Sequence, residues 1–101
     1  MTEESSPHDN WVIYIIQGGD GSYYTGITKN IEKRFKDHVS GKGSKYLRGR
    51  GPLDIVFKIN AGSHSLALKY EIGIKKLSRN DKLKLISDPS LLEELVKIEK
   101  Q

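Results

Sequence analysis

The chain has 101 residues, with 17 Lys or Arg against 13 Asp or Glu, and a formal net charge of +4. It has no cysteine, which excludes disulfide frameworks and cysteine-ligated zinc sites. No apolar run approaches the roughly 20 residues that a membrane-spanning helix needs. The polar, acidic start lacks the features of a secretory signal. We therefore expect one soluble, cytoplasmic domain without a membrane partner.

Positive charge is concentrated in the middle of the chain. Residues 1–10 contain three acidic residues and no Lys or Arg, whereas residues 88–101 contain four acidic residues and two lysines. The body between these ends is strongly basic, which suggests a polyanionic partner such as nucleic acid. The alternative is a surface that merely keeps the protein soluble, because charge patterns discriminate weakly.

The N-terminal part predicts an arm followed by a hairpin. Residues 1–10 are expected to be a disordered arm. The β-branched and aromatic residues over 11–16 predict a strand, and residues 23–28 predict a second one. A turn-forming cluster at 18–22 separates them, so the two strands should form a β-hairpin.

The middle of the chain predicts a helix, a loop and a third strand. Asn30 is expected to cap a helix over 31–40, whose apolar residues recur at helical spacing. Residues 40–52 are glycine-rich and basic, which predicts a loop. The apolar run over 53–59 predicts the third strand, and residues 61–63 predict a break after it.

Two helices are predicted next. Residues 64–77 place an apolar stripe on one helical face. Ser78 is expected to cap the following helix, in which Leu83 and Ile86 would form the apolar face.

The C-terminal end predicts a last helix. Ser90 and Glu93 form a capping-box pattern, so residues 88–101 are expected to be a C-terminal helix after a domain over 11–87. The resulting order is ββαβααα, which indicates an α+β fold with a small antiparallel sheet.

Two tyrosines of the hairpin are candidate functional residues. An odd turn of three or five residues would place Tyr14 and Tyr24 on the same face of the sheet, opposite or diagonal to each other. Gly26 would leave open space beside them, because it has no side chain. The alternative is a pair of half-buried strand tyrosines without a chemical role.

The predicted helices add three more candidates. Arg34 and His38 are four residues apart and share one helix face, where an arginine can bind a phosphate bidentately. Glu71 lies at the edge of an apolar stripe, where a carboxylate needs a partner or a divalent cation. The alternatives are a solvated arginine, a histidine at the edge of the core, and a surface glutamate paired with Lys75.

The basic loop contains residues that suit nucleic-acid binding. Its glycines allow close approach of a ligand, and Tyr46 offers a ring on which a base can stack. The loop contains no acidic residue, and its cations suit contacts with a phosphate backbone. These cations are Lys42, Lys45, Arg48 and Arg50. The alternative is a mobile, solvated loop.

The order of these residues resembles the GIY-YIG nuclease superfamily. Val12-Ile13-Tyr14 and Tyr24-Thr25-Gly26 match the two tripeptides of the family, ten residues apart from tyrosine to tyrosine. Arg34 follows on the next helix and Glu71 on a later one, as in the family pattern. Further stretches, such as Gly41-Lys42-Gly43, resemble the small, stand-alone bacterial members. The resemblance covers roughly residues 11–87.

This resemblance implies a three-stranded antiparallel sheet flanked by helices and a phosphodiester-cleaving activity with one Mg²⁺ or Mn²⁺ ion. Glu71 would hold the metal, and Tyr24 would be the general base that activates water. Tyr14 would position the nucleophile or the phosphate, and Arg34 would stabilise charge on the phosphoryl oxygens. His38 would assist Tyr24 or bind phosphate. DNA rather than RNA is the expected substrate.

Two other hypotheses stay open. In the first, the chain is a nucleic-acid-binding module without catalysis, which would bind with a steep salt dependence. Otherwise it is a protein-interaction domain, whose C-terminal helix docks a protein partner. The residues for that docking would be Leu91, Leu92, Leu95 and Val96.

Overall fold

The computed structural model describes residues 10–98, so residues 1–9 of the predicted arm and the last three residues lie outside the description. The described part contains a three-stranded antiparallel sheet with the strand order β2-β1-β3. Its strands are β1 (Trp11–Gln17), β2 (Tyr23–Thr28) and β3 (Asp54–Gly62). This arrangement confirms the predicted α+β class and places β2 at an edge of the sheet.

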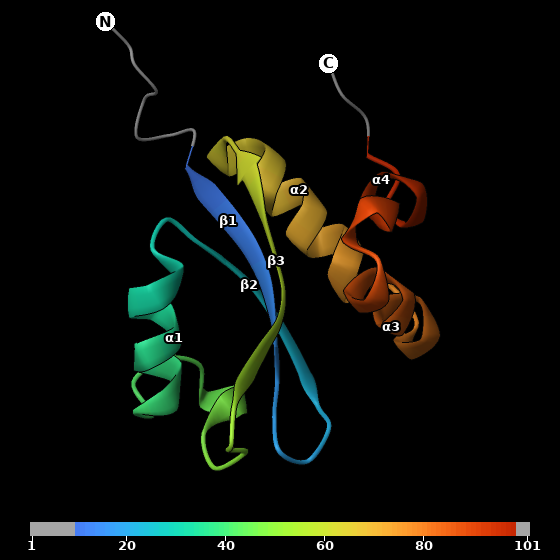
Figure 1. The fold of residues 1–101 in the computed structure, drawn as a ribbon. Helices are drawn as coiled ribbons and strands as arrows, with labels where there is room; N and C mark the ends of the chain where they lie inside the picture. The colour runs from blue at the N-terminus through green and yellow to red at the C-terminus, as the bar shows by residue number, and fades with distance from the viewer. Residues whose placement is uncertain (1–9, 99–101) are drawn as a thin grey trace, which may run out of the picture.

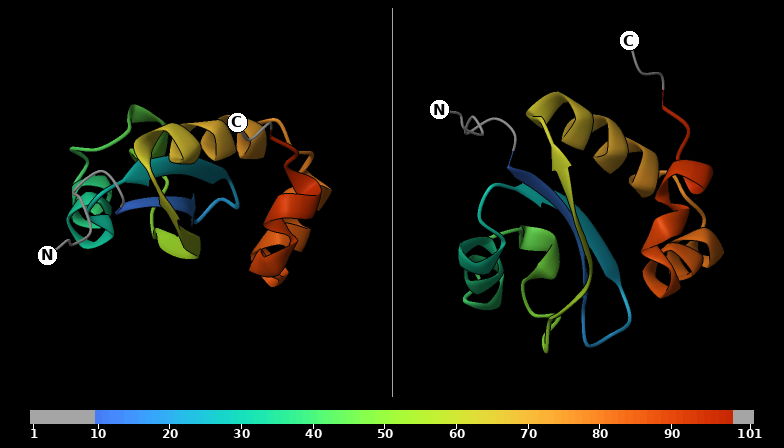
Figure 2. Two further views of the ribbon diagram at one scale, coloured as in Figure 1. Left: turned by 90° about the horizontal axis from the view of Figure 1, so that it is seen from above. Right: turned by 45° about the horizontal axis from the view of Figure 1, so that its top comes forward.

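The central strand β1 is covered on both faces, which explains its continuous apolar run. Ile13 and Ile15 point into one cluster of buried residues, and Tyr14 and Ile16 point into another. Figure 1 shows α1 (Ile31–Val39) on one side of the sheet and the helices of the C-terminal half on the other. Figure 2 shows the same separation from two further directions.

Strand β3 is longer than predicted, because residues 61 and 62 belong to it. The expected break over 61–63 is therefore wrong: Gly62 pairs with Trp11 at the start of β1. The neighbouring strand offers a partner that the local sequence does not reveal. Gly62 has a φ of 82°, a conformation that favours glycine, and it ends the strand.

Helix α1 begins as predicted, since the side chain of Asn30 accepts a hydrogen bond from the Lys33 backbone N–H at 3.0 Å. The following segment was expected to be loop throughout. It instead contains the 3-10 helix η2 (Lys45–Leu47). Leu47 is buried beneath the sheet face that carries Tyr14. This burial holds the segment close to the sheet.

Helix α2 (His64–Lys75) and helix α3 (Arg79–Ser87) cover the opposite face. Ser78 caps α3 as predicted, by accepting a hydrogen bond from the Asp81 N–H at 3.1 Å. The predicted apolar face of α3 is partly wrong, because Leu85 is fully buried whereas Leu83 is 44% exposed. Packing against the C-terminal segment decides which of the two leucines turns inward.

The C-terminal segment differs from the predicted long helix. It contains the 3-10 helix η3 (Pro89–Leu91) and the short helix α4 (Leu92–Leu95). Asp88, not Ser90, provides the cap, because its side chain accepts a hydrogen bond from the Ser90 N–H. None of the helices in residues 10–98 is long and apolar enough to cross a membrane.

The proposed docking face of this segment is not supported. Leu92 and Val96 are buried in the protein's own core, and Leu95 packs against it. Val96 lies directly against Gly73 of α2, where an added Cβ atom would collide with it. These apolar residues pack in the core with residues of α2 and the sheet, so they are not available to a partner.

Candidate active site at the edge of the sheet

Tyr14 and Tyr24 lie on the same face of the sheet, as the period of the strands requires. Tyr14 pairs with Gly26, and Ile16 pairs with Tyr24, so the two tyrosines are diagonal neighbours. Their ring centroids are 6.3 Å apart. A Cβ atom on Gly26 would lie 2.5 Å from the Tyr14 hydroxyl oxygen. Glycine at this position therefore gives the phenol its space, as expected from the sequence.

The buried His38 ring holds the phenol of Tyr14. Its Nε2 lies 2.9 Å from the Tyr14 hydroxyl, and its Nδ1 accepts a hydrogen bond from the Ser44 backbone N–H at 3.2 Å. A neutral imidazole that accepts at Nδ1 carries its proton on Nε2, so His38 donates to Tyr14. Burial, and secondarily the charge of Arg34, lower the pKa of His38 and favour this neutral form.

Arg34 reaches the same phenol from one helical turn earlier. Burial raises the pKa of Tyr14 to about 12, although a hydrogen bond from the Arg34 side chain opposes this rise. The phenol oxygen therefore accepts from His38, and the Arg34 side chain acts on the same oxygen electrostatically. Its own hydrogen is then available to a further acceptor, such as a substrate oxygen.

Tyr24 is more accessible than Tyr14. Tyr14 is only 1% exposed, whereas Tyr24 is partly exposed and lines a pocket of about 370 Å³ along the edge strand β2. The Tyr24 ring contacts the edge of His38 at a centroid distance of 5.3 Å. On its other side it stacks on Tyr46 at 6.2 Å. Of the two phenols, Tyr24 is the one that a water molecule in the pocket can approach.

Glu71 approaches this edge from the opposite face of the sheet, on α2. Its carboxylate forms an ion pair with Lys75 at 3.4 Å, the arrangement that the sequence offered as the alternative to metal binding. Its charge contributes to the raised pKa of Tyr14, so the two groups interact electrostatically. Lys75 lines the same pocket as Tyr24, which brings α2 to the edge where the tyrosines lie.

The Glu71 carboxylate fits a hard cation that keeps water ligands. Within residues 10–98 no group of three or more His, Asp or Glu side chains is close enough to share a metal ion. Mg²⁺ is commonly held by one or two carboxylates, with water and substrate phosphate completing the coordination. The Glu71 side chain, 17% exposed, meets that modest requirement.

The basic loop divides into exposed and engaged cations. Lys42, Lys45 and Arg48 are exposed to solvent. Arg50 instead forms an ion pair with Asp20 at 2.6 Å and donates from Nε to the Tyr46 carbonyl oxygen, also at 2.6 Å. Its guanidinium lies 4.4 Å from the centre of the Tyr46 ring. Arg50 thus supports Tyr46 at the protein surface.

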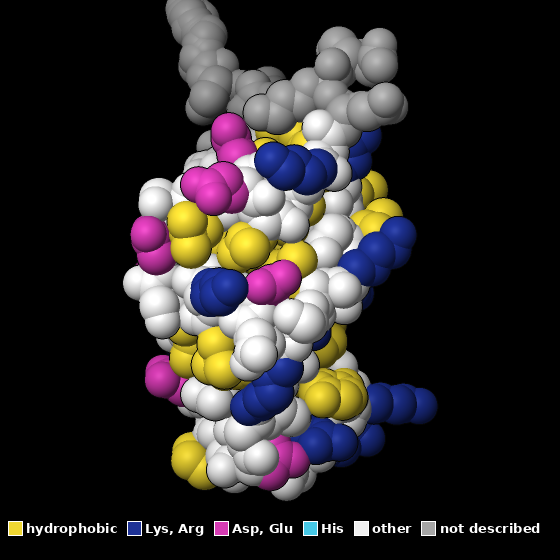
Figure 3. All heavy atoms as spheres, turned by 90° about the vertical axis from the view of Figure 1, so that its right-hand side faces the viewer, with side chains coloured by type: hydrophobic (Ala, Val, Ile, Leu, Met, Phe, Trp, Pro, Cys, Tyr) yellow, Lys and Arg dark blue, Asp and Glu magenta, His cyan; other side chains and the backbone are white. Residues whose placement is uncertain are grey.

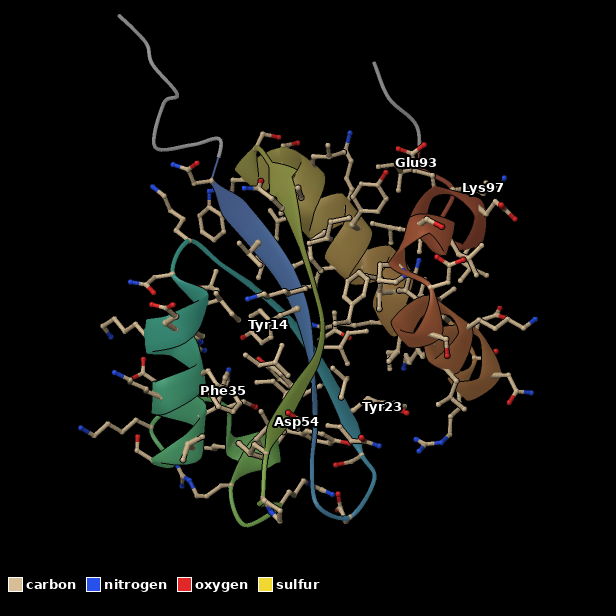
Figure 4. All side chains as sticks on the ribbon, viewed as in Figure 1. Tyr14, Tyr23, Phe35, Asp54, Glu93 and Lys97 are labelled. Carbon is tan, nitrogen blue, oxygen red and sulfur yellow. The ribbon has the colours of Figure 1, made fainter. Side chains whose placement is uncertain are left out.

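Three residues near the site were not singled out from the sequence. Lys82 lines the pocket beside Tyr24, together with Tyr23. Arg79 covers the Tyr23 ring at 4.6 Å and donates to the Gly21 carbonyl oxygen at 3.0 Å. Figure 4 shows Tyr23 projecting from β2 toward α3, whereas Tyr14 lies on the side of α1. No local sequence pattern indicates these residues, because their position near the site depends on where α3 packs.

Comparisons with known proteins agree with this geometry. Residues 10–84 match the family model described as the GIY-YIG catalytic domain. The chain is 47% identical to the UPF0213 protein PC1_0597 of Pectobacterium carotovorum, over 87% of this chain and 88% of the relative. It is 41% identical to the UPF0213 protein YhbQ of Escherichia coli O127:H6, over 85% and 86%.

A solved structure is also similar. The solution NMR structure of the UPF0213 protein BH0048 from Bacillus halodurans superposes with a TM-score of 0.52 at 38% sequence identity. The match covers 88% of this chain and 98% of that one. The sheet and helices described above therefore recur in an experimentally determined relative.

Proposed function

The chain belongs to the GIY-YIG family, a nuclease superfamily, and on that premise we propose that it is a metal-dependent endonuclease that hydrolyses phosphodiester bonds in DNA. One observation carries the proposal. His38 hydrogen-bonds to Tyr14, the Arg34 charge acts on the same phenol, and Tyr24 lies beside them at the pocket. Such a cluster of hydrogen-bond donors around a hydroxyl can bind a phosphate and stabilise its charge during hydrolysis.

Tyr24 is proposed as the general base. It borders the pocket, where its ionised phenol would take a proton from the water that attacks the phosphorus. Tyr14 is a poor base, because burial raises its pKa to about 12.

Tyr14 and Arg34 are proposed to orient and stabilise the phosphate. The phenol hydrogen of Tyr14 is free to be donated, since its oxygen already accepts from His38. The Arg34 guanidinium is partly exposed and stays charged, so it can also meet a phosphoryl oxygen. His38 acts through Tyr14, because it is buried and its Nε2 is directed to the phenol.

Glu71 is proposed to hold one Mg²⁺ or Mn²⁺ ion. A bound ion would supply charge neutralisation at the scissile phosphate and at the leaving 3′ oxygen. The exposed cations of the loop, Lys42, Lys45 and Arg48, are proposed to contact the DNA backbone. Tyr46 is proposed to contact the nucleotide through its ring.

A second candidate function is a nucleic-acid-binding module without catalysis. The ion pair between Glu71 and Lys75 favours it, because this pairing occupies the carboxylate that the metal needs. Such a module would bind DNA as strongly with or without Mg²⁺.

Incubation of the protein with labelled DNA in Mg²⁺ or Mn²⁺ separates the two functions. The endonuclease cleaves, and Tyr24→Phe lowers the rate about 100- to 10,000-fold while binding persists. Glu71→Gln abolishes the metal-dependent activity, whereas Glu94→Gln on the remote helix α4 does not. Binding without cleavage by the unmodified protein would establish the module instead. RNA of the same sequence tests the preference for DNA.

A further inference from the structure

The pocket along β2 contains side chains that the proposed reaction does not use. Its volume is about 370 Å³, within the range of small-ligand sites. We name it the β2-edge pocket; its lining residues are Tyr23, Tyr24, Thr25, Tyr46, Lys75 and Lys82. Only Tyr24 belongs to the proposed hydrolysis, so the other residues serve a different purpose.

The lining combines two cations with aromatic rings. Lys75 and Lys82 come from different helices, α2 and α3, and no carboxylate lines the pocket. Lys82 is partly buried and has no ion-pair partner within residues 10–98. A partly buried lysine side chain without a counter-ion favours the binding of an anion. Another pocket in the described part of the chain, of about 340 Å³, has a mostly apolar lining and no lysine.

The surrounding surface is polarised in the same sense. Figure 3 shows the side formed by the C-terminal helices, where Lys and Arg side chains gather toward the right-hand edge. Asp and Glu side chains lie mostly toward the left of that view. A polyanion that approaches this side is drawn toward one edge rather than toward its middle.

We propose that the β2-edge pocket holds the nucleotide next to the scissile phosphate, with Lys75 and Lys82 contacting its backbone phosphate. The tyrosine rings then pack against the sugar. This proposal rests on the proposed function, since Tyr24 in the pocket wall marks where the bond is cut. It adds a subsite that reads no base and fixes the path of the strand past Tyr24.

The test uses Lys82→Gln, which removes one charge from α3 without touching the proposed catalytic residues. The matched control is Lys84→Gln on the same helix, an exposed lysine that pairs weakly with Asp81 at 3.8 Å and lies outside the pocket. Circular dichroism melting of both variants verifies that each is folded. Binding of fluorescein-labelled DNA is measured by anisotropy over a KCl series without divalent metal.

A phosphate contact has a distinctive salt signature. Lys82→Gln should weaken binding about 3- to 10-fold and reduce the slope of log K against log salt by about one. With Mg²⁺ present it should raise KM by a similar factor and leave kcat within about twofold, because uniform binding is lost. Lys84→Gln should change neither the slope nor KM.

The outcomes separate this subsite from the proposed function. If the unmodified protein cleaves DNA and Lys82→Gln behaves like Lys84→Gln, the subsite is wrong and the nuclease stands. If no DNA is cleaved but Lys82→Gln still loses one unit of salt slope, Lys82 is a phosphate contact, while catalysis and the position beside a scissile phosphate fall. Absence of DNA binding by the unmodified protein overturns both.

Discussion

His38 and Tyr14, 24 positions apart in the chain, meet in the interior with 2.9 Å between the imidazole Nε2 and the phenol oxygen. The Ser44 N–H fixes the other ring nitrogen as an acceptor, so the imidazole is a neutral donor. A Cβ atom on Gly43 would collide with the same ring. The start of the basic loop thus sets the protonation state of His38, which contacts Tyr14 of the proposed active site.

The neutral state of His38 predicts a pH-dependent stability. Its pKa in the folded protein is lowered from 6.5, so the unfolded chain binds more protons in that range. The contribution is complete above pH 6.5 and is lost as pH falls through the lowered value. Urea unfolding should therefore show the free energy of unfolding decreasing as pH falls below 6.5. The decrease should be smaller in His38→Gln, and equal slopes for both proteins would contradict this account.

Gly26→Ala should damage the site by crowding rather than by removing a group. The added methyl would lie 2.5 Å from the Tyr14 hydroxyl, so the phenol or the strand must shift. We expect a loss of about 1–3 kcal/mol in stability and about 100-fold in cleavage rate. Thermal melting and single-turnover kinetics measure the two effects.

Gly51→Ala is the matched control for that substitution. Its added methyl would meet no atom within 4 Å, so stability and rate should stay close to those of the unmodified protein. Full activity of Gly26→Ala would show that Tyr14 does not need its present position.

Lys75→Gln should strengthen metal binding. The Lys75 ammonium occupies the Glu71 carboxylate at 3.4 Å and must leave it when a cation binds there. Lys75 is exposed and Glu71 only partly so, and a pair near the surface contributes about 0.2–1 kcal/mol, so Mn²⁺ affinity should increase about threefold. Mn²⁺ titration followed by electron paramagnetic resonance measures it. Lys69→Gln, on the same helix outside that ion pair, should leave the affinity unchanged, and equal affinities for both variants would place the metal elsewhere.

Arg50 and Arg48 should respond differently to the same substitution. Arg50→Gln removes the ion pair with Asp20 and the support beneath Tyr46, so the wall that stacks on Tyr24 loosens. We expect kcat to fall as well as KM to rise. Arg48→Gln, exposed in the same loop, should raise KM alone. Identical kinetic effects of the two variants would remove the positioning role of Arg50.

Local rules were sufficient for most elements and failed where distant segments decide. Asn30 and Ser78 cap their helices as expected, because a cap needs only the next three residues. Leu85 rather than Leu83 turned out to be buried, since a nine-residue helix with closely spaced apolar residues has no unique inner face. Strand β3 extends to Gly62 because Trp11 is available as a partner.

The sequence by itself determined that the two tyrosines share a face if the turn is odd, since side chains alternate along a strand, and the structure supplied the turn of five residues. It also placed Arg34 and His38 one helical turn apart. Only the tertiary structure decided that both reach Tyr14, that Arg50 turns inward to Asp20, and that Lys82 joins the pocket. These contacts depend on how elements far apart in the chain pack together, and no residue pattern within a single element encodes that packing.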